Sequence, residues 1–432
     1  MRESVLLARC WQIPRVWLSA WFLLIVTVYA ENPMSQPPAT IQVDVDNLQA
    51  TLDAAPEHST VAFNRNRQLT LSEPLIVRKP LTIQGLNAKL PEKLGGTPLV
   101  IVESKDVSVI DCEFRGNRET VPQELRAPLL TIREGNFRVE RCNFLDSSKD
   151  GIKIDGEGVK DRDIEGGVIR DIYGKGCVRD LVSLSGGGEH GHRIRHVLVE
   201  NIRDYDSEMR GAVEVSDGTC DITVRNVYAE RCVYALDVQD HGKPQQVNTN
   251  VLIEDVTAVD CKHIIRTANH DFGHANLTLR DFIGERCSEP LKVSNTRNVV
   301  IDNVQIGGHP KGGSPVSVKN CSRLSVREVT IENSAHEEAG LLLVDCSGVF
   351  VDNLAVTGEG TKLAHALLAR YGGGKAYSGL QIHNVSARNV SKEGVRLERS
   401  DDASTLSDVV ISDNMATVEN LMTGTRVNVQ KD

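Results

Sequence analysis

A repeat of about 24 residues between positions 217 and 293 constrains this chain more than any other feature. Three consecutive copies read CDITVRNVYAERCVYALDVQD, NVLIEDVTAVDCKHIIRTAN and NLTLRDFIGERCSEPLKVSN. Each copy holds three short β-type runs, and one polar residue separates the first two runs: Asn226, Asp255 and Asp281. A unit this short cannot bury its own apolar face, so it must stack on its neighbours. The repeat therefore predicts the turns of a parallel β-helix.

Further copies extend the pattern over most of the chain. A first strand recurs from Pro98–Val102 to Gly394–Glu398, which predicts an all-β solenoid of about a dozen turns. Short polar side chains at the corner after the second strand tolerate left-handed backbone and hydrogen-bond the adjacent turn. This corner column contains Asn201, Asn226, Asp255, Asp281, Asn303, Glu328, Asn353, Asn384 and Asp413.

The N-terminal residues do not follow the repeat. Arg2, Arg9 and Arg15 precede an apolar run over 16–30, which is the pattern of a secretory signal peptide, with an uncleaved anchor as the alternative. We therefore expect a secreted or periplasmic protein. The expected segments are a signal peptide over 1–30, a linker over 31–40, a helical N-terminal cap over 41–60 and a β-helix domain over 61–432.

Composition restricts the partners. The chain has 432 residues, a formal net charge of −10 and no long run of Lys and Arg, which disfavours nucleic acid. Aromatic residues make up only 4%, which suits a solenoid core of stacked aliphatic side chains. No second long apolar run occurs, so we expect no membrane contact beyond the signal peptide, and a monomer.

Nine of the ten cysteines lie beyond the predicted signal peptide. Their positions in the repeat are those of small apolar residues stacked in interior columns, where free cysteines commonly lie. No CxxC pair occurs, which disfavours a metal site. We expect structural thiols, and a disulfide between Cys321 and Cys346 remains open.

The segment LTLSEPLIVRKPLTIQG at 69–85 resembles the opening of the pectin-lyase-like superfamily of right-handed parallel β-helices. The resemblance continues as repeats through the rest of the chain. It implies a right-handed β-helix and, as in carbohydrate-active members, a substrate groove along the outer face of one sheet. The implied partner is a polysaccharide. Such a fold supports no single activity.

Alternation along the first strand of each turn places charged side chains on that outer face. The first outward row is predicted to be Lys153, Ser183, Glu214, Asp237, Arg266, Lys292, Ser317 and Leu343. The second is predicted to be Asp155, Ser185, Ser216, Gln239, Ala268, Ser294, Lys319 and Asp345.

Glu214 and Asp237 are expected one turn apart, about 4.8 Å between backbones. Two carboxylates at this spacing could share Ca²⁺, with Asp155 completing the site, or could perform acid/base catalysis on a glycosidic bond. The alternative is a solvated charge ladder with Arg266 and Lys292. Adjacent like charges repel and are retained mainly at functional sites, which favours the functional interpretation.

Arg266 and Lys292 suit an acidic polysaccharide. Elimination next to a uronate carboxylate needs a base to remove a proton and a cation to stabilise the enolate. Several lyases of the resembled superfamily use Arg or Lys from this sheet as the base, with calcium on nearby acids. The catalytic candidates are therefore Glu214, Asp237, Arg266 and Lys292. Binding of a polyanion without chemistry is the alternative role for the two cations.

Insertions at 156–166, 186–193, 240–248 and 269–275 follow successive first strands and are expected to wall the groove. His241 and His270 lie in two of these loops, and histidine is a suitable base near neutral pH. A surface histidine is the alternative for each. The substrate-binding candidates are Lys153, Asp155, Asp180, Arg210, His241, Asn269 and His270.

The polygalacturonase-like hydrolases of the same superfamily offer a second comparison. The segment 148–152 (SKDGI) resembles their Asn-Thr-Asp-Gly motif, and Asp180 falls near their paired Asp. Arg179 replaces the first Asp of that pair, and Arg210 begins a segment where Gly-His-Gly belongs. These departures leave Asp150 and Asp180 as candidate acids of a variant hydrolase.

Three functions follow from the sequence. The first is a lyase, or a C5 epimerase using the same proton abstraction, on an acidic polysaccharide. The second is a polygalacturonase-like glycoside hydrolase. The third is a non-catalytic carbohydrate-binding or adhesive β-helix.

Overall fold

The computed structural model describes residues 39–43, 47–118, 120–269, 272–308, 310, 313–360, 362–412, 416–422 and, for the backbone, 427–430. The predicted signal peptide over 1–30 and most of the predicted linker lie outside these residues. Among the described residues, no helix has the length and apolar character needed to span a bilayer.

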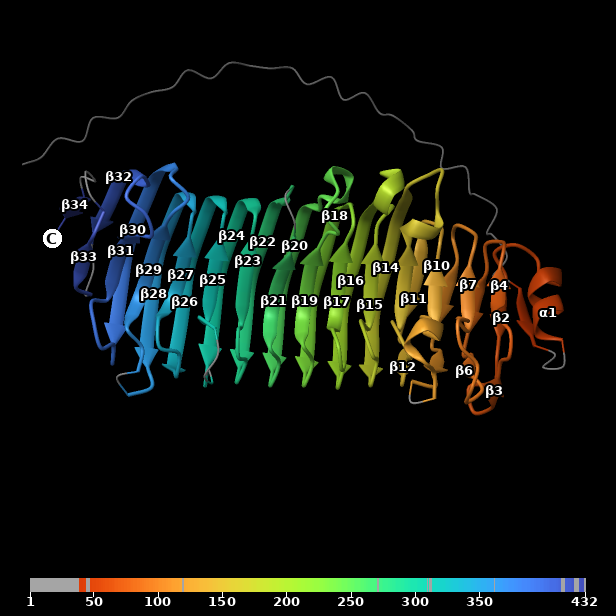
Figure 1. The fold of residues 1–432 in the computed structure, drawn as a ribbon. Coiled ribbons are helices and arrows are strands. Elements are labelled where there is room, and N and C mark those ends of the chain that lie inside the picture. The colour runs from red at the N-terminus through yellow and green to blue at the C-terminus, as the bar shows by residue number, and fades with distance from the viewer. Residues whose placement is uncertain are drawn as a thin grey trace, which may run out of the picture. The chain divides into compact units, whose positions relative to one another are not determined.

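A 14-stranded sheet receives one strand from each successive turn of the chain, and its neighbouring strands pair in parallel (Figure 1). Its strands are β4 (Leu75–Val77), β7 (Val100–Val102), β10 (Leu130–Ile132), β13 (Ile152–Asp155), β15 (Val182–Ser185), β17 (Gly211–Ser216), β19 (Tyr234–Gln239), β21 (His263–Ala268), β23 (Leu291–Ser294), β25 (Val316–Lys319), β27 (Ala339–Val344), β29 (His365–Tyr371), β31 (Val395–Arg399) and β33 (Val418–Asn420).

The remaining strands form a 20-stranded sheet, in which a bend divides each long strand into two runs. These strands are β1 (Thr40–Gln42), β2 (Thr60–Ala62), β3 (Gln68–Thr70), β5 (Thr82–Gln84), β6 (Asn87–Lys89), β8 (Ser108–Ile110), β9 (Glu113–Arg115), β11 (Phe137–Glu140), β12 (Asn143–Leu145), β14 (Ile164–Lys175), β16 (Ile194–Tyr205), β18 (Thr219–Glu230), β20 (Thr249–Val259), β22 (His274–Glu285), β24 (Thr296–Gly307), β26 (Ser322–Ser334), β28 (Ser347–Gly358), β30 (Ala376–Arg388), β32 (Thr405–Ser412) and β34 (Val427–Gln430). The predicted all-β parallel solenoid is confirmed.

The described helical segments are short. The α-helix α1 (Leu48–Ala54) buries Leu52, and its Gln49 side chain exchanges hydrogen bonds of 3.0 and 2.9 Å with the backbone of Ile76 in β4. The helix therefore contacts the edge strand of the 14-stranded sheet, although a cap over the whole of 41–60 stays a prediction. Four 3₁₀ turns lie in loops: η1 (Gln123–Leu125), η2 (Gly156–Gly158), η3 (Gly188–His190) and η4 (Pro244–Gln246).

The bend inside the long strands carries the predicted polar corner column. Every described member of that column has a left-handed backbone, with φ between 51 and 59°. Side-chain amides join successive turns, as in the Asn226 Nδ2 to Asn201 Oδ1 bond of 2.7 Å and the Asn303 Nδ2 to Asp281 Oδ1 bond of 2.7 Å. The column thus sets the bend and the register together. Asp413 lies outside the described residues.

A second polar corner corrects the predicted alignment beyond residue 317. Asn320 and Asp345 both have positive φ, 53 and 54°, so Asp345 is a corner residue like Asn320 and not an outward strand residue. Consequently Ser317 pairs with Leu342, and Lys319 pairs with Val344. The predicted places of Leu343 and Asp345 in the outward rows were wrong by one residue.

The interior is aliphatic, with cysteines at the predicted small positions. Of the nine described cysteines, eight are buried, Cys220 is partly exposed, and all are free thiols. Their sulfurs pack against backbone carbonyls of the same or the neighbouring turn, as Cys346 does with Val318 O at 3.5 Å. The open possibility of a disulfide between Cys321 and Cys346 is therefore not realised.

One acid is buried inside this core. The Asp204 carboxyl accepts a hydrogen bond of 2.7 Å from Ser207 Oγ and contacts the Cys232 thiol. Burial raises its pKa to about 6, although these two hydrogen bonds oppose the rise. No described cation forms an ion pair with Asp204. Ionisation of Asp204 therefore lowers the stability of the folded state.

Replacement of Asn226 tests the corner column. Asn226→Ala should lower the free energy of unfolding by about 2 kcal/mol, because a left-handed non-glycine residue costs about 1–2 kcal/mol and lost hydrogen bonds add to that. Asn226→Gly relieves the backbone strain and should lose only the hydrogen-bond contribution. Urea unfolding measures both. Equal stability of the alanine variant and the native protein would contradict the role of this column.

The pH dependence of stability tests Asp204. Between about pH 4 and 6 the folded state keeps the Asp204 proton and the unfolded state does not, so stability falls as pH rises through this window. The difference between about 6 and the ordinary 3.8 corresponds to about 3 kcal/mol. Asp204→Asn should remove the contribution of Asp204 to this loss of stability with rising pH. Urea unfolding at several pH values measures it, and parallel profiles for the two proteins would show that Asp204 is not the source.

Candidate functional site

The first outward row of the 14-stranded sheet lies where the sequence predicts it. Lys153 pairs with Ser183, Ser183 with Glu214, and Glu214 with Asp237. The row continues from Asp237 to Arg266 and from Arg266 to Lys292. The four catalytic candidates and Lys153 therefore stand one above another on a single face.

Glu214 is buried at the centre of this face and accepts hydrogen bonds from several neighbours. Ser183 Oγ donates to its Oε2 at 2.6 Å, and Arg210 Nη1 and Gln239 Nε2 both contact its Oε1. Arg179 Nη2 lies 3.6 Å from the same carboxylate. Burial alone would raise the pKa of Glu214, but Arg210, Ser183 and Arg179 together hold it below its ordinary value.

Asp180 lies beside Glu214 and has the opposite electrostatic environment. The Tyr234 hydroxyl donates to its Oδ1 at 2.7 Å, and Arg210 Nη1 donates to its Oδ2 at 3.3 Å. Complete burial, followed by the charges of Glu214 and Asp150, raises the pKa of Asp180 well above its usual range. Asp180 therefore holds a proton that Glu214 lacks, and a hydrogen bond from Asp180 helps to keep Glu214 ionised.

Gly211 makes the contact between Tyr234 and Asp180 possible. It pairs with Tyr234 in the sheet register, at the start of β17. A Cβ at position 211 would lie 1.6 Å from the Tyr234 carbonyl oxygen and 2.9 Å from its ring. Only glycine lets the Tyr234 ring cross this turn and reach the acid on the turn beyond.

Asp237 forms a separate pair with Arg266. Arg266 Nε donates to Asp237 Oδ1 at 3.1 Å, its Nη2 contacts the other oxygen, and the guanidinium lies 5.2 Å from the centre of the Tyr234 ring. Burial raises the pKa of Asp237 to about 6 against the opposing effect of Arg266. Burial lowers the pKa of Arg266, but Asp237 outweighs it and raises that pKa above its ordinary value.

Arg179, Arg210 and Arg266, here named the arginine row, cover the buried acids. Their side chains are 28, 23 and 30% exposed, whereas Asp180, Glu214 and Asp237 are at most 2% exposed. Each guanidinium group thus contacts a buried acid on its inner side and reaches solvent on its outer side. Burial also raises the pKa of Asp150, which Arg179 contacts at 3.4 Å. The raised pKa values of Asp150 and Asp180 weaken the negative charge beneath the row.

Calcium shared by Asp155, Glu214 and Asp237 does not fit this arrangement. Asp155 is paired with Lys153 at 3.0 Å and Arg133 at 3.1 Å, while Glu214 and Asp237 have their own arginine partners. Each carboxylate is therefore neutralised separately. Within the described ranges, no group of three or more His, Cys, Asp or Glu side chains is arranged to hold a metal ion.

Lys292 differs from the arginine row. Its side chain is half exposed, and its ammonium lies 3.6 Å from Glu289 of its own turn. It continues the row by one turn but covers no buried acid. Lys153 lies at the other end of the outward row. Its ammonium forms ion pairs with Asp155 and, at 3.1 Å, with Glu157.

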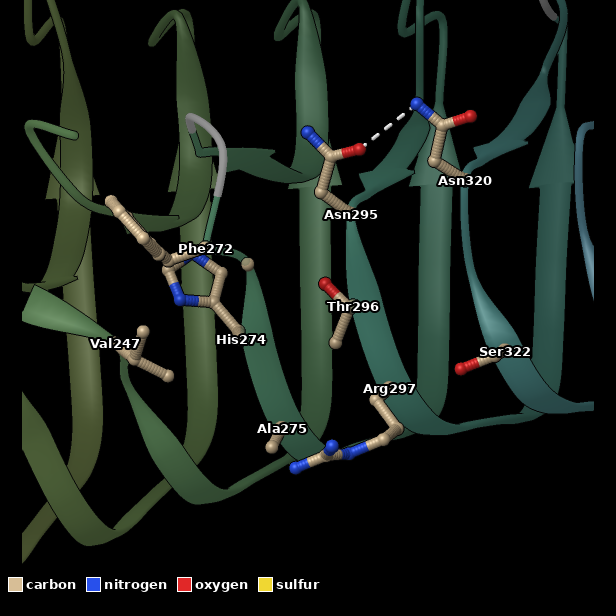
Figure 2. Close-up of a pocket in the computed structure, with 10 residues that line it drawn as sticks. Val247, Phe272, His274, Ala275, Asn295, Thr296, Arg297, Asn320 and Ser322 are labelled. Carbon is tan, nitrogen blue, oxygen red and sulfur yellow. Dashed lines mark hydrogen bonds between the residues drawn. The ribbon is translucent and has the colours of Figure 1, made fainter. Parts of the chain in front are cut away.

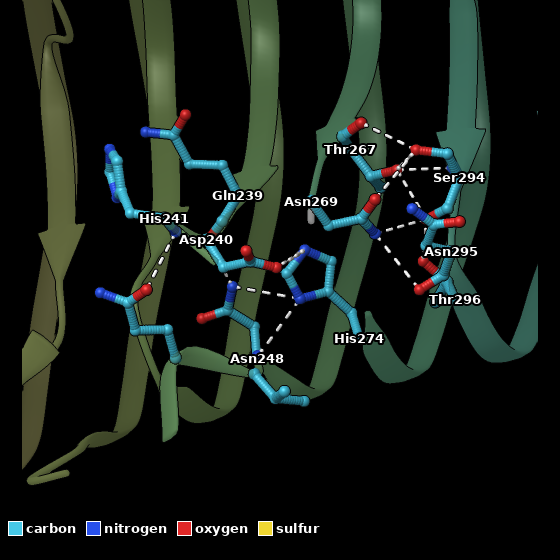
Figure 3. Close-up of polar contacts among 12 residues, drawn as sticks. Gln239, Asp240, His241, Asn248, Thr267, Asn269, His274, Ser294, Asn295 and Thr296 are labelled. Carbon is cyan, nitrogen blue, oxygen red and sulfur yellow. Dashed lines mark hydrogen bonds and ion pairs between the residues drawn. The ribbon is translucent and has the colours of Figure 1, made fainter. Parts of the chain in front are cut away.

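The loops that follow the strands hold a second group of polar residues. Figure 3 shows His241 and Asp240 after β19, and Asn248 and His274 at the neighbouring turns. His274 Nδ1 accepts the Asn248 backbone N–H at 3.3 Å, and burial lowers the pKa of His274 to about 4. Asn269 Nδ2 donates to the Asn295 carbonyl at 3.2 Å, which makes it a loop anchor. His270 lies outside the described residues.

Two pockets open among these loops. One, of about 440 Å³, is lined by His274, Asn295 and Arg297 among others, and lies by the first residues of β22 and β24 in the 20-stranded sheet (Figure 2). It is therefore not part of the predicted groove. The other, of about 340 Å³, lies at the carboxyl ends of β13, β15 and β19. It is lined by Glu157, Gly187, Gly188, His190, His241, Lys243 and Gln246.

Sequence reasoning missed Tyr234, Gly211 and Asp217. The sequence does not single out Tyr234, because its hydroxyl partner lies 54 positions away. Gly211 stands where a strand residue is expected, and a glycine in that place is the one available signal of a close approach. Asp217 pairs with His241 at 2.8 Å, which the sequence does not show.

Comparison with known proteins agrees with the observed coil. Residues 272–432 match the family model described as a right-handed β-helix region. The pre-mature bacteriophage phi29 gene product 12 has a TM-score of 0.55 and 12% identity over 90% of this chain and 64% of its own. The fold is a right-handed parallel β-helix.

The catalytic domain of one carbohydrate enzyme shows a similar coil. The catalytic domain of GH87 alpha-1,3-glucanase in complex with nigerose has a TM-score of 0.51 and 10% identity over 89% of this chain and 69% of its own. The A-module of the Azotobacter vinelandii mannuronan C-5 epimerase AlgE4 has a TM-score of 0.49 and 13% identity over 84% of this chain and 95% of its own. No curated protein sequence matches the chain. At such low identity these likenesses concern the fold alone.

Removal of one hydroxyl tests the buried contact. Tyr234→Phe should lower the free energy of unfolding by about 1–3 kcal/mol, because the buried Asp180 loses its hydrogen-bond donor. Tyr173→Phe is the matched control, since its ring is 39% exposed and surface changes stay within about 0.5 kcal/mol. Urea unfolding at pH 7 measures both. A Tyr234→Phe variant as stable as the control would contradict the proposed support of Asp180.

Proposed function

We propose that this β-helix protein binds an acidic polysaccharide along the arginine row and acts on it as an enzyme. The observation that carries the proposal is the anchoring of three partly exposed guanidinium groups by buried acids. A guanidinium held from below keeps its outer N–H groups in a fixed direction, which suits the planar carboxylate of a uronate. Little side-chain entropy is then lost on binding.

The charge of the face supports a polyanion over a neutral polymer. Burial raises the pKa of Asp150 and, further, that of Asp180, so these acids oppose the charge of the arginines above them less than free carboxylates would. Neutral sugars bind largely through stacking and hydroxyl contacts and would not need such a row. The likeness of the coil to a glucanase supports the polysaccharide class but not its charge.

The predicted signal peptide supports a place of action outside the cytoplasm. Extended acidic polymers occur there, and an open groove on a long solenoid face accommodates a chain without enclosing it. Secretion or periplasmic export therefore belongs to the same proposal.

Proton abstraction by a lyase or C5 epimerase is the favoured chemistry, but Arg266 is a poor base for it. Its guanidinium is bound to Asp237, which raises its pKa, so it holds its proton more firmly than a free arginine does. Arg266 is better suited to bind the uronate carboxylate and stabilise the enolate. Lys292 keeps a half-exposed ammonium at the next turn and is the base candidate that remains in this row.

Hydrolysis is the second candidate, and the acids Asp180 and Glu214 favour it. Their environments drive the two pKa values apart, which is the arrangement of a general acid next to an ionised partner. Their burial beneath Arg179 and Arg210 opposes it, because a glycosidic oxygen reaches them only if an arginine moves. Product analysis separates the two candidates.

Incubation with a panel of polyuronates, sulfated polymers and neutral glucans tests the activity. A lyase gives an unsaturated product that absorbs in the ultraviolet, an epimerase changes uronate stereochemistry without cleavage, and a hydrolase gives reducing ends without that absorbance. Addition of EDTA tests for calcium dependence, which the separately paired carboxylates do not predict. Binding without any of these changes would leave a non-catalytic β-helix and overturn the enzymatic part of the proposal.

Arg179→Gln tests the binding face. We expect about a tenfold rise in Kd for a polyuronate, equivalent to about 1.4 kcal/mol, together with weaker salt dependence. Arg225→Gln is the matched control, because this arginine is about half exposed but pairs with Glu200 in the 20-stranded sheet. Isothermal titration calorimetry measures both. An equal effect of the two changes would contradict the arginine row as the binding face.

A further inference from the structure

Asp217 and His241 form a pair that the arginine row does not use. His241 Nδ1 lies 2.8 and 3.0 Å from the two Asp217 oxygens. Asp217 is buried, whereas the His241 side chain is 59% exposed and lines the 340 Å³ pocket, here named the loop pocket. A carboxylate behind Nδ1 fixes the proton on that nitrogen and leaves the Nε2 lone pair facing outward.

The backbone around His241 is held in place. The Gln246 side-chain oxygen accepts the N–H groups of His241 at 3.1 Å and of Lys243 at 3.2 Å. Asp240 accepts the Gly242 N–H at 2.8 Å. Each of these bonds orients the turn that carries the imidazole. The ring is therefore positioned both by its own loop and by Asp217 of the preceding turn.

The loop pocket brings charged groups from three turns to this imidazole. Glu157 comes from η2, His190 from η3, and Lys243 from the same loop as His241. Lys153 neutralises Glu157 at 3.1 Å. Burial raises the pKa of Asp217, and the hydrogen bond from His241 opposes that rise. Lys243 thus provides positive charge, and His190 an imidazole N–H donor, beside a proton acceptor.

The loop pocket continues the proposed groove. His241 follows β19 by two residues, and the last residue of that strand, Gln239, contacts Glu214 and pairs with Ser216. A polymer held by the arginine row can therefore place a further sugar unit at the carboxyl ends of the same strands. A sugar unit at this position would meet the exposed imidazole of His241, whereas the acids beneath the arginine row are buried.

We propose that His241, oriented by Asp217, is the proton-abstracting residue of this protein, and that the loop pocket takes one uronate unit with its carboxylate against Lys243 and His190. This inference rests on the proposed function. His241 Nε2 takes the proton from the carbon next to the carboxylate. The C–H electron pair forms the carbon–carbon double bond, and the C–O bond to the adjacent sugar breaks. The departing oxygen receives the proton back from the imidazolium.

Asp217 is a positioning residue in this reaction, since it touches only the imidazole. The negative charge of Asp217 compensates the imidazolium that forms when His241 takes the proton. Lys243 neutralises the uronate carboxylate and His190 donates a hydrogen bond to it, which makes the adjacent proton removable. The rate should fall at acidic pH, because a general base must be unprotonated to accept the proton.

The test uses the purified full chain with polygalacturonate and alginate as probes. His241→Gln should lower kcat by about 10²–10⁴-fold with KM within threefold of native, and should abolish the acidic limb of the pH profile. Asp217→Asn should lower kcat about tenfold at unchanged KM. His196→Gln is the matched control, because His196 is also exposed but lies on β16 of the 20-stranded sheet. Ultraviolet absorbance measures the product.

A readout independent of activity guards against misfolding. The ¹⁵N spectrum of the histidines should show His241 with its proton on Nδ1 in the native protein and a mixture of tautomers in Asp217→Asn. Circular dichroism should be unchanged in all variants.

The outcomes separate this inference from the proposed function. Loss of turnover in His241→Gln with retained polyuronate binding supports the inference. Turnover within twofold of native in that variant, or reducing ends without ultraviolet absorbance, overturns it and leaves binding by the arginine row intact. No polyuronate binding by the native chain overturns both.

Discussion

The register between successive turns is the constraint on which the rest of this structure depends. Parallel strands about 4.8 Å apart place equivalent residues of each turn in columns. Left-handed Asn and Asp corners hold this register, because Asn side-chain amides donate to the side-chain oxygen at the same corner of the preceding turn, as Asn226 does to Asn201. A slip of one residue would turn every outward charge into the core. The functional face is therefore a consequence of the corners.

Burial of acids gives that face its character. A carboxylate removed from water must be protonated or paired, and both solutions occur here. Asp180 takes the first with Tyr234 as its donor, whereas Glu214 and Asp237 take the second with Arg210 and Arg266. The arginines gain fixed positions and the protein gains an exposed cationic row. At the carboxyl ends of the same strands, a buried acid again holds an exposed basic side chain. There Asp217 contacts the imidazole of His241 in place of a guanidinium.

In the function proposed above, one part of the face binds the polymer and another transfers the proton. A base must have an accessible lone pair, which Arg266 lacks because Asp237 holds it, and which His241 Nε2 has. The position of the three inserted loops explains this difference. They wall the strand ends around His241 and leave the arginine row open to an extended polymer.

The sequence by itself determined the repeat, the parallel coil and the vertical order of Lys153, Glu214, Asp237, Arg266 and Lys292, because strand alternation and stacking are local and periodic. It also marked the polar corners, although it shifted Leu343 and Asp345 by one residue where a corner was mistaken for a strand position. Only the tertiary structure decided which acids are buried, which arginine each one holds, and that Tyr234 crosses Gly211 to reach Asp180. These contacts depend on how far each side chain reaches into the neighbouring turns and on which groups are shielded from water. Neither property follows from the repeat pattern of the sequence.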